Sequence, residues 1–339
     1  MTTHDERLAG FVFSADGQIF DSHGLQICMF GVVDFEHFWT AFDAMSASPL
    51  GRKLIYAAAD AEETSLVRSG LSSSSWLQAR KTKRRIHHRN LVMGWGFIDD
   101  RSIHFPAHDA LGVGVALAQH EQRTKQRWKV QWNQQSADFI ALDFTPQDRD
   151  ISPLNDVKPP SWGGGLRGSP ARAGPVTELD FREYGFFYGQ QRSFFLPVSV
   201  FDRLYVALSG RSFNPLFSLT VATETGPVPD DRLFQAVAAA SKSMFDRSDV
   251  PVFVLQPGDW EDFLQQRVSA YGLGTVEVLH AEVEGDFETV FRVVSPLPAY
   301  TCGLLHGIWE RCFGQRTEPE VLVANRHVEF TARKLRLDY

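Results

Sequence analysis

Near the N-terminus, the spacing of hydrophobic positions changes from that of strands to that of a helix. Residues 10–31 hold two apolar runs, Phe11–Phe13 and Leu25–Phe30, with turn-forming residues between them. The next apolar residues recur at the spacing of one helix face: Phe35, Phe38, Trp39 and Phe42. The pattern therefore predicts a β-hairpin that leads directly into an amphipathic helix.

The rest of the first half continues with helices and short strand pairs. Ser48-Pro49 ends the first helix, and Pro49 can open a second one. The later segments predict a basic helix or arm, a strand pair, a helix and a closing strand pair: residues 80–89, 90–99 with 102–105, 107–119, and 128–132 with 139–142.

The second half repeats this order of elements. Its expected elements are strands 185–188 and 194–196, helices 199–209, 231–245 and 260–271, strands 275–283 and 289–294, helix 302–313, and strands 320–324 and 328–337. Both halves therefore predict an α+β fold, with two tandem copies of an antiparallel sheet packed with helices.

Residue identities repeat along with the pattern. Residues 32–42 return as residues 198–208, with Phe35 matching Phe201 at an offset of 166 (201 − 35 = 166). Further matches keep the same order at larger offsets: Pro106-Ala107 with Pro298-Ala299, Gln122-Arg123-Thr124 with Gln315-Arg316-Thr317, and Leu142-Asp143-Phe144 with Leu337-Asp338-Tyr339. A period this long is typical of a duplicated domain rather than a solenoid.

The repeat also predicts the domain boundaries. We expect a first domain at residues 1–144 and a second at residues 177–339, and a chain of 339 residues is long enough for two cores. Residues 145–176 are rich in proline and glycine, which predicts a linker between the domains.

Composition narrows the class of protein. The net charge of −7 disfavours a nucleic-acid binder, and no apolar stretch is long enough to span a membrane. The cysteines Cys28, Cys302 and Cys312 form no paired framework, and the N-terminus shows no apolar signal segment. These features favour a cytoplasmic protein.

Three segments carry a resemblance to a known family. They are the apolar strand and amphipathic helix at 194–208, the helix entry at 298–307 followed by 313–315, and the closing strand pair. In these segments the chain resembles the 4-vinyl reductase domain family, which is similar to haem–nitric-oxide-binding sensor domains and to small subunits of vesicle-tethering complexes. The resemblance implies a small-molecule-sensing or scaffolding domain that pairs with its like. Two fused copies would form that pair within one chain, as a pseudo-dimer.

Two features of these families are absent from the sequence. Residues 320–339 contain no cysteine, so we predict no zinc site at the closing strands, and the Tyr-x-Ser-x-Arg signature of the haem sensors does not occur. No phosphate loop, nucleophile elbow or His-Glu-x-x-His motif is present, so no catalytic residue is assigned and the cofactor is unknown.

Aromatic and soft side chains are the candidates for a ligand site between the helices and one face of the sheet. The expected lining is Phe194, Phe195, Trp309 and Phe313 in the second half, with Trp39 and Trp95 in the first. Cys302 and His306 are four residues apart on one expected helix, a spacing that fits two metal ligands or a haem contact. The alternative is a small buried thiol and a hydrogen-bonded histidine.

A basic run is the candidate for a partner surface. It contains Arg80, Lys81, Lys83, Arg84, Arg85 and Arg89. Because aromatic residues do not interleave with these charges, a docking patch for an acidic protein or a solvated helix face is favoured over a nucleic-acid site.

Three hypotheses for function follow. The first is a non-enzymatic small-ligand-sensing or scaffolding protein that binds a small apolar ligand, as a monomeric pseudo-dimer or a homo-oligomer. The second is an interaction subunit of a larger assembly. The third is a tetrapyrrole-handling enzyme or cofactor carrier that uses Cys302 and His306.

Overall fold

The structure is a computed structural model. It describes residues 10–71, 76–149, 151, 157–162, 179–224, 226–228, 230–254, 256, 258–281 and 288–335, without the side chains of 76–79. Helices pack against sheets whose neighbouring strands are almost all antiparallel, which confirms the predicted mixed class of helix and antiparallel sheet. Most of the predicted linker, and the match at 337–339, lie outside the described residues.

A six-stranded antiparallel sheet joins the two halves of the chain. Its strand order is β1-β2-β3-β10-β9-β8. The strands are β1 (Phe11–Phe13), β2 (Ile19–Asp21), β3 (Gln26–Gly31), β8 (Leu179–Arg182), β9 (Gly185–Tyr188) and β10 (Gln191–Pro197). The central pair is β3 and β10, where Met29 lies opposite Phe195. Met29 and Phe195 are also 166 residues apart (195 − 29 = 166). Two residues at equivalent positions of the repeat therefore lie opposite each other where the two halves meet.

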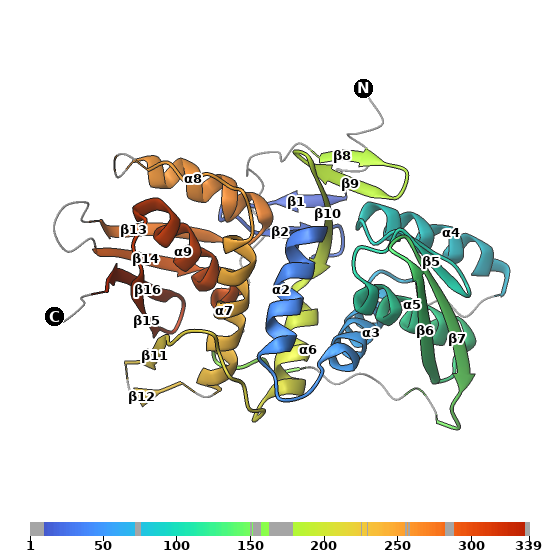
Figure 1. Cartoon of the computed structure of the whole chain (residues 1–339). Coiled ribbons are helices and arrows are strands. Elements are labelled where there is room, and N and C mark those ends of the chain that lie inside the picture. The colour runs from blue at the N-terminus through green and yellow to red at the C-terminus, as the bar shows by residue number, and fades with distance from the viewer. Residues whose placement is uncertain are drawn as a thin grey trace.

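The remaining elements of the first half form one lobe, on the right of Figure 1. Its helices and strands are α2 (Val32–Ala44), α3 (Gly51–Arg68), α4 (Trp76–Val92), β4 (Phe97–Ile98), β5 (Ser102–His104), α5 (Asp109–Thr124), β6 (Trp128–Ser136) and β7 (Phe139–Pro146). The four strands form a sheet in the order β4-β5-β7-β6. Helix α2 is the exception, because it lies near the centre of the molecule.

The second half contributes the lobe on the left of Figure 1. The helical elements of this half are α7 (Asp231–Asp246), α8 (Asp259–Arg267), the 3₁₀ helix η1 (Ser269–Tyr271) and α9 (Pro298–Phe313), with α6 (Val198–Leu208) near the centre of the molecule. Its strands are β11 (Thr220–Thr223), β12 (Gly226–Pro227), β13 (Thr275–Ala281), β14 (Glu288–Val294), β15 (Thr317–Val323) and β16 (Val328–Lys334). The order β13-β14-β16-β15 matches that of the other lobe, and β11 extends it in parallel to β15.

Helix packing crosses between the halves. Helix α2 packs against α7, and α3 packs against α6, while α3·α5 and α7·α9 pair within their own lobes. Phe35, Phe38 and Phe42 on α2 are almost completely buried, as their spacing predicted. The ring of Phe38 lies 5.2 Å from that of Tyr300 on α9. One continuous hydrophobic core therefore includes both lobes and the central sheet.

The same glycine turn precedes the lobe sheet in each half. Gly94 and Gly96 flank Trp95, Gly272 and Gly274 flank Leu273, and all four glycines have φ between 76° and 88°. At Gly94, a Cβ would lie 2.7 Å from the carbonyl oxygen of Ser193 on β10. Only glycine fits such a left-handed turn so close to a neighbouring strand.

Several predicted boundaries need correction. The predicted hairpin at 10–31 is three strands, and the expected helix at 260–271 ends at Arg267 before the 3₁₀ turn. The helix expected at 302–313 begins at Pro298, since proline is well tolerated in a first helical turn. The match of Gln122-Arg123-Thr124 with Gln315-Arg316-Thr317 is wrong in register. The first triplet lies in the last turn of α5, whereas Thr317 opens β15.

Candidate functional site

A groove of about 620 Å³ lies between α4 and α5 in the first-half lobe. Apolar side chains from four elements and one loop form part of its wall: Leu71, Ile86, Ile98, Ala116 and Phe144. Charged side chains also line it: Arg80, Lys83, Asp99, Asp100, Arg123 and Lys125. His87, His120, Gln119 and smaller polar residues complete the lining. The groove is thus apolar in part and bordered by four cations and two carboxylates.

The local sequence explains why this space stays open. Helix α4 is largely charged, and Ile86 is its apolar contribution to the groove. Helix α5 is buried up to Ala118, but its last turn carries exposed Arg123. Long charged side chains keep their ends in water rather than fill space between helices. The groove therefore lies where the side chains of the two helices become polar.

Ion pairs hold the charged border together. Lys83 Nζ lies 3.3 Å from Asp99 and 3.2 Å from Asp100, and Arg123 also pairs with Asp100. Partial burial raises the pKa of Asp100, but the hydrogen bonds from Arg123 and Lys83 outweigh it and lower the pKa below its usual value. The hydrogen bond to Asp100 chiefly raises the pKa of Lys83. Asp100 is therefore ionised at neutral pH, and both carboxylates are already engaged with cations.

His120 carries a hydrogen-bond donor that has no partner in the described part of the chain. Its ring stacks on Phe144 at 4.1 Å and meets the edge of Trp128 at 4.7 Å. Burial, reinforced by the charge of Arg123, lowers the pKa of His120, so the ring is neutral at pH 7. Arg123 is only a donor, so Nδ1, 3.0 Å from its guanidinium, accepts and Nε2 carries the proton. Nε2 is buried without a hydrogen bond.

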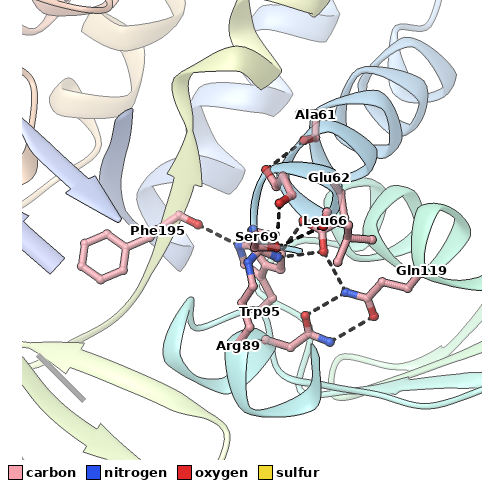
Figure 2. A network of polar contacts seen from close by, with 10 residues as sticks. Ala61, Glu62, Leu66, Ser69, Arg89, Trp95, Gln119 and Phe195 are labelled. Atoms are coloured by element: carbon pink, nitrogen blue, oxygen red, sulfur yellow. Dashed lines mark hydrogen bonds and ion pairs between the residues drawn. The ribbon is translucent and has the colours of Figure 1, made fainter. Parts of the chain in front are cut away.

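A buried polar network lies beneath the groove and connects three helices (Figure 2). Arg89 Nη1 on α4 donates to both carboxylate oxygens of Glu62 on α3, each at 2.7 Å. Gln119 on α5 donates to Glu62 at 3.0 Å and to Asn90 at 2.8 Å. Burial raises the pKa of Glu62, and the Arg89 charge opposes that rise. The network fixes α4 against α3 and α5, and its Gln119 also lines the groove.

The same network reaches the central sheet through Trp95. The Arg89 guanidinium lies 4.8 Å from the Trp95 ring, and Trp95 Nε1 donates to the Phe195 carbonyl at 2.7 Å (Figure 2). The Phe195 amide in turn donates to the Met93 carbonyl at 2.8 Å. The turn after α4 is therefore anchored to β10 of the other half.

The aromatic residues expected to line a ligand site lie mostly in the core. Phe194 and Phe195 are fully buried, with Phe194 against Phe35 at 5.4 Å and Phe195 against Phe186 at 4.7 Å. Trp309 is also fully buried and donates to the Thr289 hydroxyl at 3.0 Å.

The other three predicted aromatic residues are also packed. Phe313 is partly buried against Trp309 at 4.8 Å, and Trp39 lies 6.1 Å from the His108 ring. Trp95 is nearly buried in the turn already described. None of the six predicted aromatics lines the α4–α5 groove.

Cys302 and His306 share a buried stretch of α9. Burial raises the pKa of the Cys302 thiol, so the sulfur stays protonated. His306 Nε2 lies 3.2 Å from Glu310, and its ring meets Phe217 edge-on at 4.6 Å. Burial lowers the pKa of His306. In the ranges that the structure describes, no three His, Cys, Asp or Glu side chains gather in a way that could hold a metal ion.

The basic run divides into three environments on α4. Arg80 and Lys83 line the groove, and Arg89 turns inward to Glu62. Lys81, Arg84 and Arg85 are exposed. Sequence reasoning missed Arg123, Lys125 and His120, which lie on or just after α5 and join the site only through tertiary packing. The Asp99-Asp100 pair could have given a signal, because it connects two strands beside the basic helix, but the sequence alone explains it as a turn.

Comparison with known proteins identifies no relative. Neither a protein-family model, a curated protein nor a solved structure matches the chain. Among the described helices, none is both long enough and apolar enough to cross a membrane.

Proposed function

We propose that the chain is a non-enzymatic small-ligand-sensing or scaffolding protein built from two 4-vinyl reductase-like domains, with its ligand in the α4–α5 groove. The observation that carries the proposal is the groove itself. Its volume of about 620 Å³ lies within the roughly 300–1,000 Å³ of small-molecule sites. Its mixture of apolar wall and convergent polar groups is also typical of such sites.

Repeated geometry supports the duplicated architecture within this proposal. The lobe sheets share one strand order, and the glycine turns recur at Gly94 and Gly272, 178 residues apart (272 − 94 = 178). Glu121 and Glu310 each accept the backbone N–H of a strand residue, Trp128 and Thr317, after α5 and α9. That places α5 and α9 at an offset of 189 (310 − 121 = 189). Two such halves, joined through β3 and β10, make a pseudo-dimer.

The same offsets identify the residues of the second half that are equivalent to residues lining the groove. Trp260 on α8 takes the position of Thr82 on α4, and Trp309 takes that of His120. Trp260 is fully buried, with its ring 5.2 Å from Phe291 and 6.4 Å from Phe313. Large rings therefore fill in the second half the space that smaller polar residues leave open in the first. This contrast supports one ligand site per chain.

The test introduces, at position 82, the tryptophan that the second half carries at the equivalent position. The variant Thr82→Trp puts an indole into the groove wall, whereas Lys81→Trp puts the same ring on the exposed face of the same helix. Phenylnaphthylamine, an uncharged probe that fluoresces in apolar sites, is expected to bind the unmodified protein and Lys81→Trp alike. Thr82→Trp should weaken the binding of the probe by at least about tenfold, or about 1.4 kcal/mol.

Circular dichroism and thermal melting of each variant show that the fold is kept. Equal binding of the probe by Thr82→Trp and the unmodified protein would refute the groove as the ligand site. The alternative of an acidic protein partner rests on exposed Lys81, Arg84 and Arg85, none of which has an ion-pair partner among the described residues. That alternative stays a prediction.

A further inference from the structure

We propose that the ligand of the α4–α5 groove is an organic anion, a small molecule with an apolar body and one acidic group. This inference rests on the proposed function and names the chemical class that the groove accepts. The acidic group would lie at Lys83 and Arg123, and the apolar body would lie on Ile98, Ala116 and Phe144.

The groove is surrounded by a surplus of hydrogen-bond donors. Lys and Arg side chains only donate, and four of them line the groove: Arg80, Lys83, Arg123 and Lys125. The acceptors that could balance them, Asp99 and Asp100, are already bound by Lys83 and Arg123. Arg80 has no ion-pair partner in the described part of the chain and is exposed. A ligand that supplies acceptors, and negative charge above all, satisfies this lining, whereas a cation or a pure donor does not.

The ion pairs at the border of the groove are exposed enough for an anion to replace one of their contacts. The pairs Lys83–Asp99, Lys83–Asp100 and Arg123–Asp100 are about half exposed to solvent. Exposed ion pairs of this kind contribute little stability, typically about 0–1 kcal/mol. A ligand carboxylate, sulfonate or phosphate can therefore replace one carboxylate contact of Arg123 or Lys83 at small cost. Asp100, which pairs with both cations, then keeps its other contact, and both carboxylates stay about half exposed to water.

The second half lacks the positive charges that border the groove in the first half. At the positions of Lys83, Arg123 and His120, the second half carries Glu261, Cys312 and Trp309. One cation is thus replaced by an acidic residue and the other by a thiol, while the polar ring becomes an apolar one. The space and the positive charge disappear together in the second half. This joint change indicates that the charges belong to the ligand site rather than to the general surface.

The experiment uses two fluorescent probes with the same rings. Anilinonaphthalene sulfonate carries one sulfonate, and phenylnaphthylamine lacks only that group. The full chain is titrated with each probe at low and moderate ionic strength, and Lys83→Met, Arg123→Met and their double variant are titrated in parallel. Arg84→Met is the control, because Arg84 lies on the exposed face of the same helix and does not line the groove.

We expect the sulfonate to bind at least about tenfold more tightly than the neutral probe, a ratio that corresponds to about 1.4 kcal/mol. Each Met variant should reduce that ratio several-fold, and the double variant should bring it close to one, with the neutral probe unaffected. Added salt should weaken the binding of the sulfonate probe alone, since the attraction between half-exposed charges is screened. Arg84→Met should behave like the unmodified protein.

The possible failures are distinguishable. Equal affinity for both probes, with both lost in Thr82→Trp, would keep the groove as a ligand site and overturn the anion class. A sulfonate preference that survives in the double variant would overturn the placement of the acidic group, and with it this inference. Failure of both probes to bind, or binding that ignores Thr82→Trp, would refute the ligand site itself.

Discussion

At the scale of single residues, the Glu62–Arg89 pair has the largest expected effect on stability. Glu62 is 1% exposed and Arg89 13%, so neither charge is fully hydrated. A buried ion pair adds little stability compared with an apolar replacement of both partners. Removing one partner, however, leaves the other charge buried and unpaired. The sequence marked Arg89 only as one member of a basic run. Nothing in that run distinguishes the residue that turns inward, because its partner is 27 positions away on another helix.

We predict that Arg89→Met destabilises the protein by about 3–5 kcal/mol near neutral pH. Burial already raises the pKa of Glu62, and losing Arg89 raises it further. A carboxyl whose pKa is higher in the folded state loses stabilisation as pH rises, so the deficit should be larger at pH 8 than at pH 5. Urea unfolding at both pH values measures this, with Arg84→Met as an exposed control. A deficit independent of pH would contradict the assignment of an unpaired Glu62.

At the scale of elements, close helix contacts depend on glycine. A Cβ at Gly303 of α9 would lie 2.0 Å from the Ala238 carbonyl oxygen of α7, and a Cβ at Gly114 of α5 would lie 2.3 Å from the Ile55 carbonyl oxygen of α3. The two contacts are 189 residues apart, the offset of α5 and α9 (303 − 114 = 189). Hydrophobic spacing predicted the existence of these helices from the sequence. It did not predict which helix each one packs against, because a buried face does not identify its partner.

Gly303→Ala is therefore expected to push α9 away from α7 and to destabilise the protein by about 1–3 kcal/mol, the usual effect of overpacking. The clash is with backbone, which cannot rotate away as a side chain would. Gly51 opens α3, and a Cβ added there would meet no atom within 4 Å. Gly51→Ala should thus be neutral or stabilising by up to about 1 kcal/mol through helix propensity. Thermal unfolding of both variants is the measurement, and equal effects would contradict the close contact.

At the scale of the whole molecule, elements that are far apart in the sequence pack together across the two halves. The sequence predicted two successive domains, and the element order of each half agrees with that pattern. The helix pairs α2·α7 and α3·α6 nevertheless cross between the halves, as does the strand pair β3·β10. Apolar periodicity is the same whether a face is covered by its own half or by the other. The resemblance predicted that the two halves pair, but the apolar pattern could not show which helices and strands make the contacts between them.

This crossing leads to a prediction about the separated halves. A cut between residues 151 and 157 leaves Trp162 with Tyr205 and Phe234, its ring neighbours at 5.0 Å and 5.2 Å. Expressed alone, each fragment would expose the apolar face of α2 or α6 and the edge of β3 or β10, and should be unfolded or aggregated. Co-expressed, the two fragments should assemble and co-purify in equal amounts.

Circular dichroism of each fragment and size-exclusion chromatography of the mixture provide the measurement. The assembled pair should bind the naphthyl probes as the intact chain does, because the groove is lined entirely by residues of the first fragment while its floor is anchored to β10 of the second. Two fragments that each fold and stay monomeric would show that the contacts across the halves contribute little. In that case the lobes would be independent domains, and the central sheet would be only a weak interface between them.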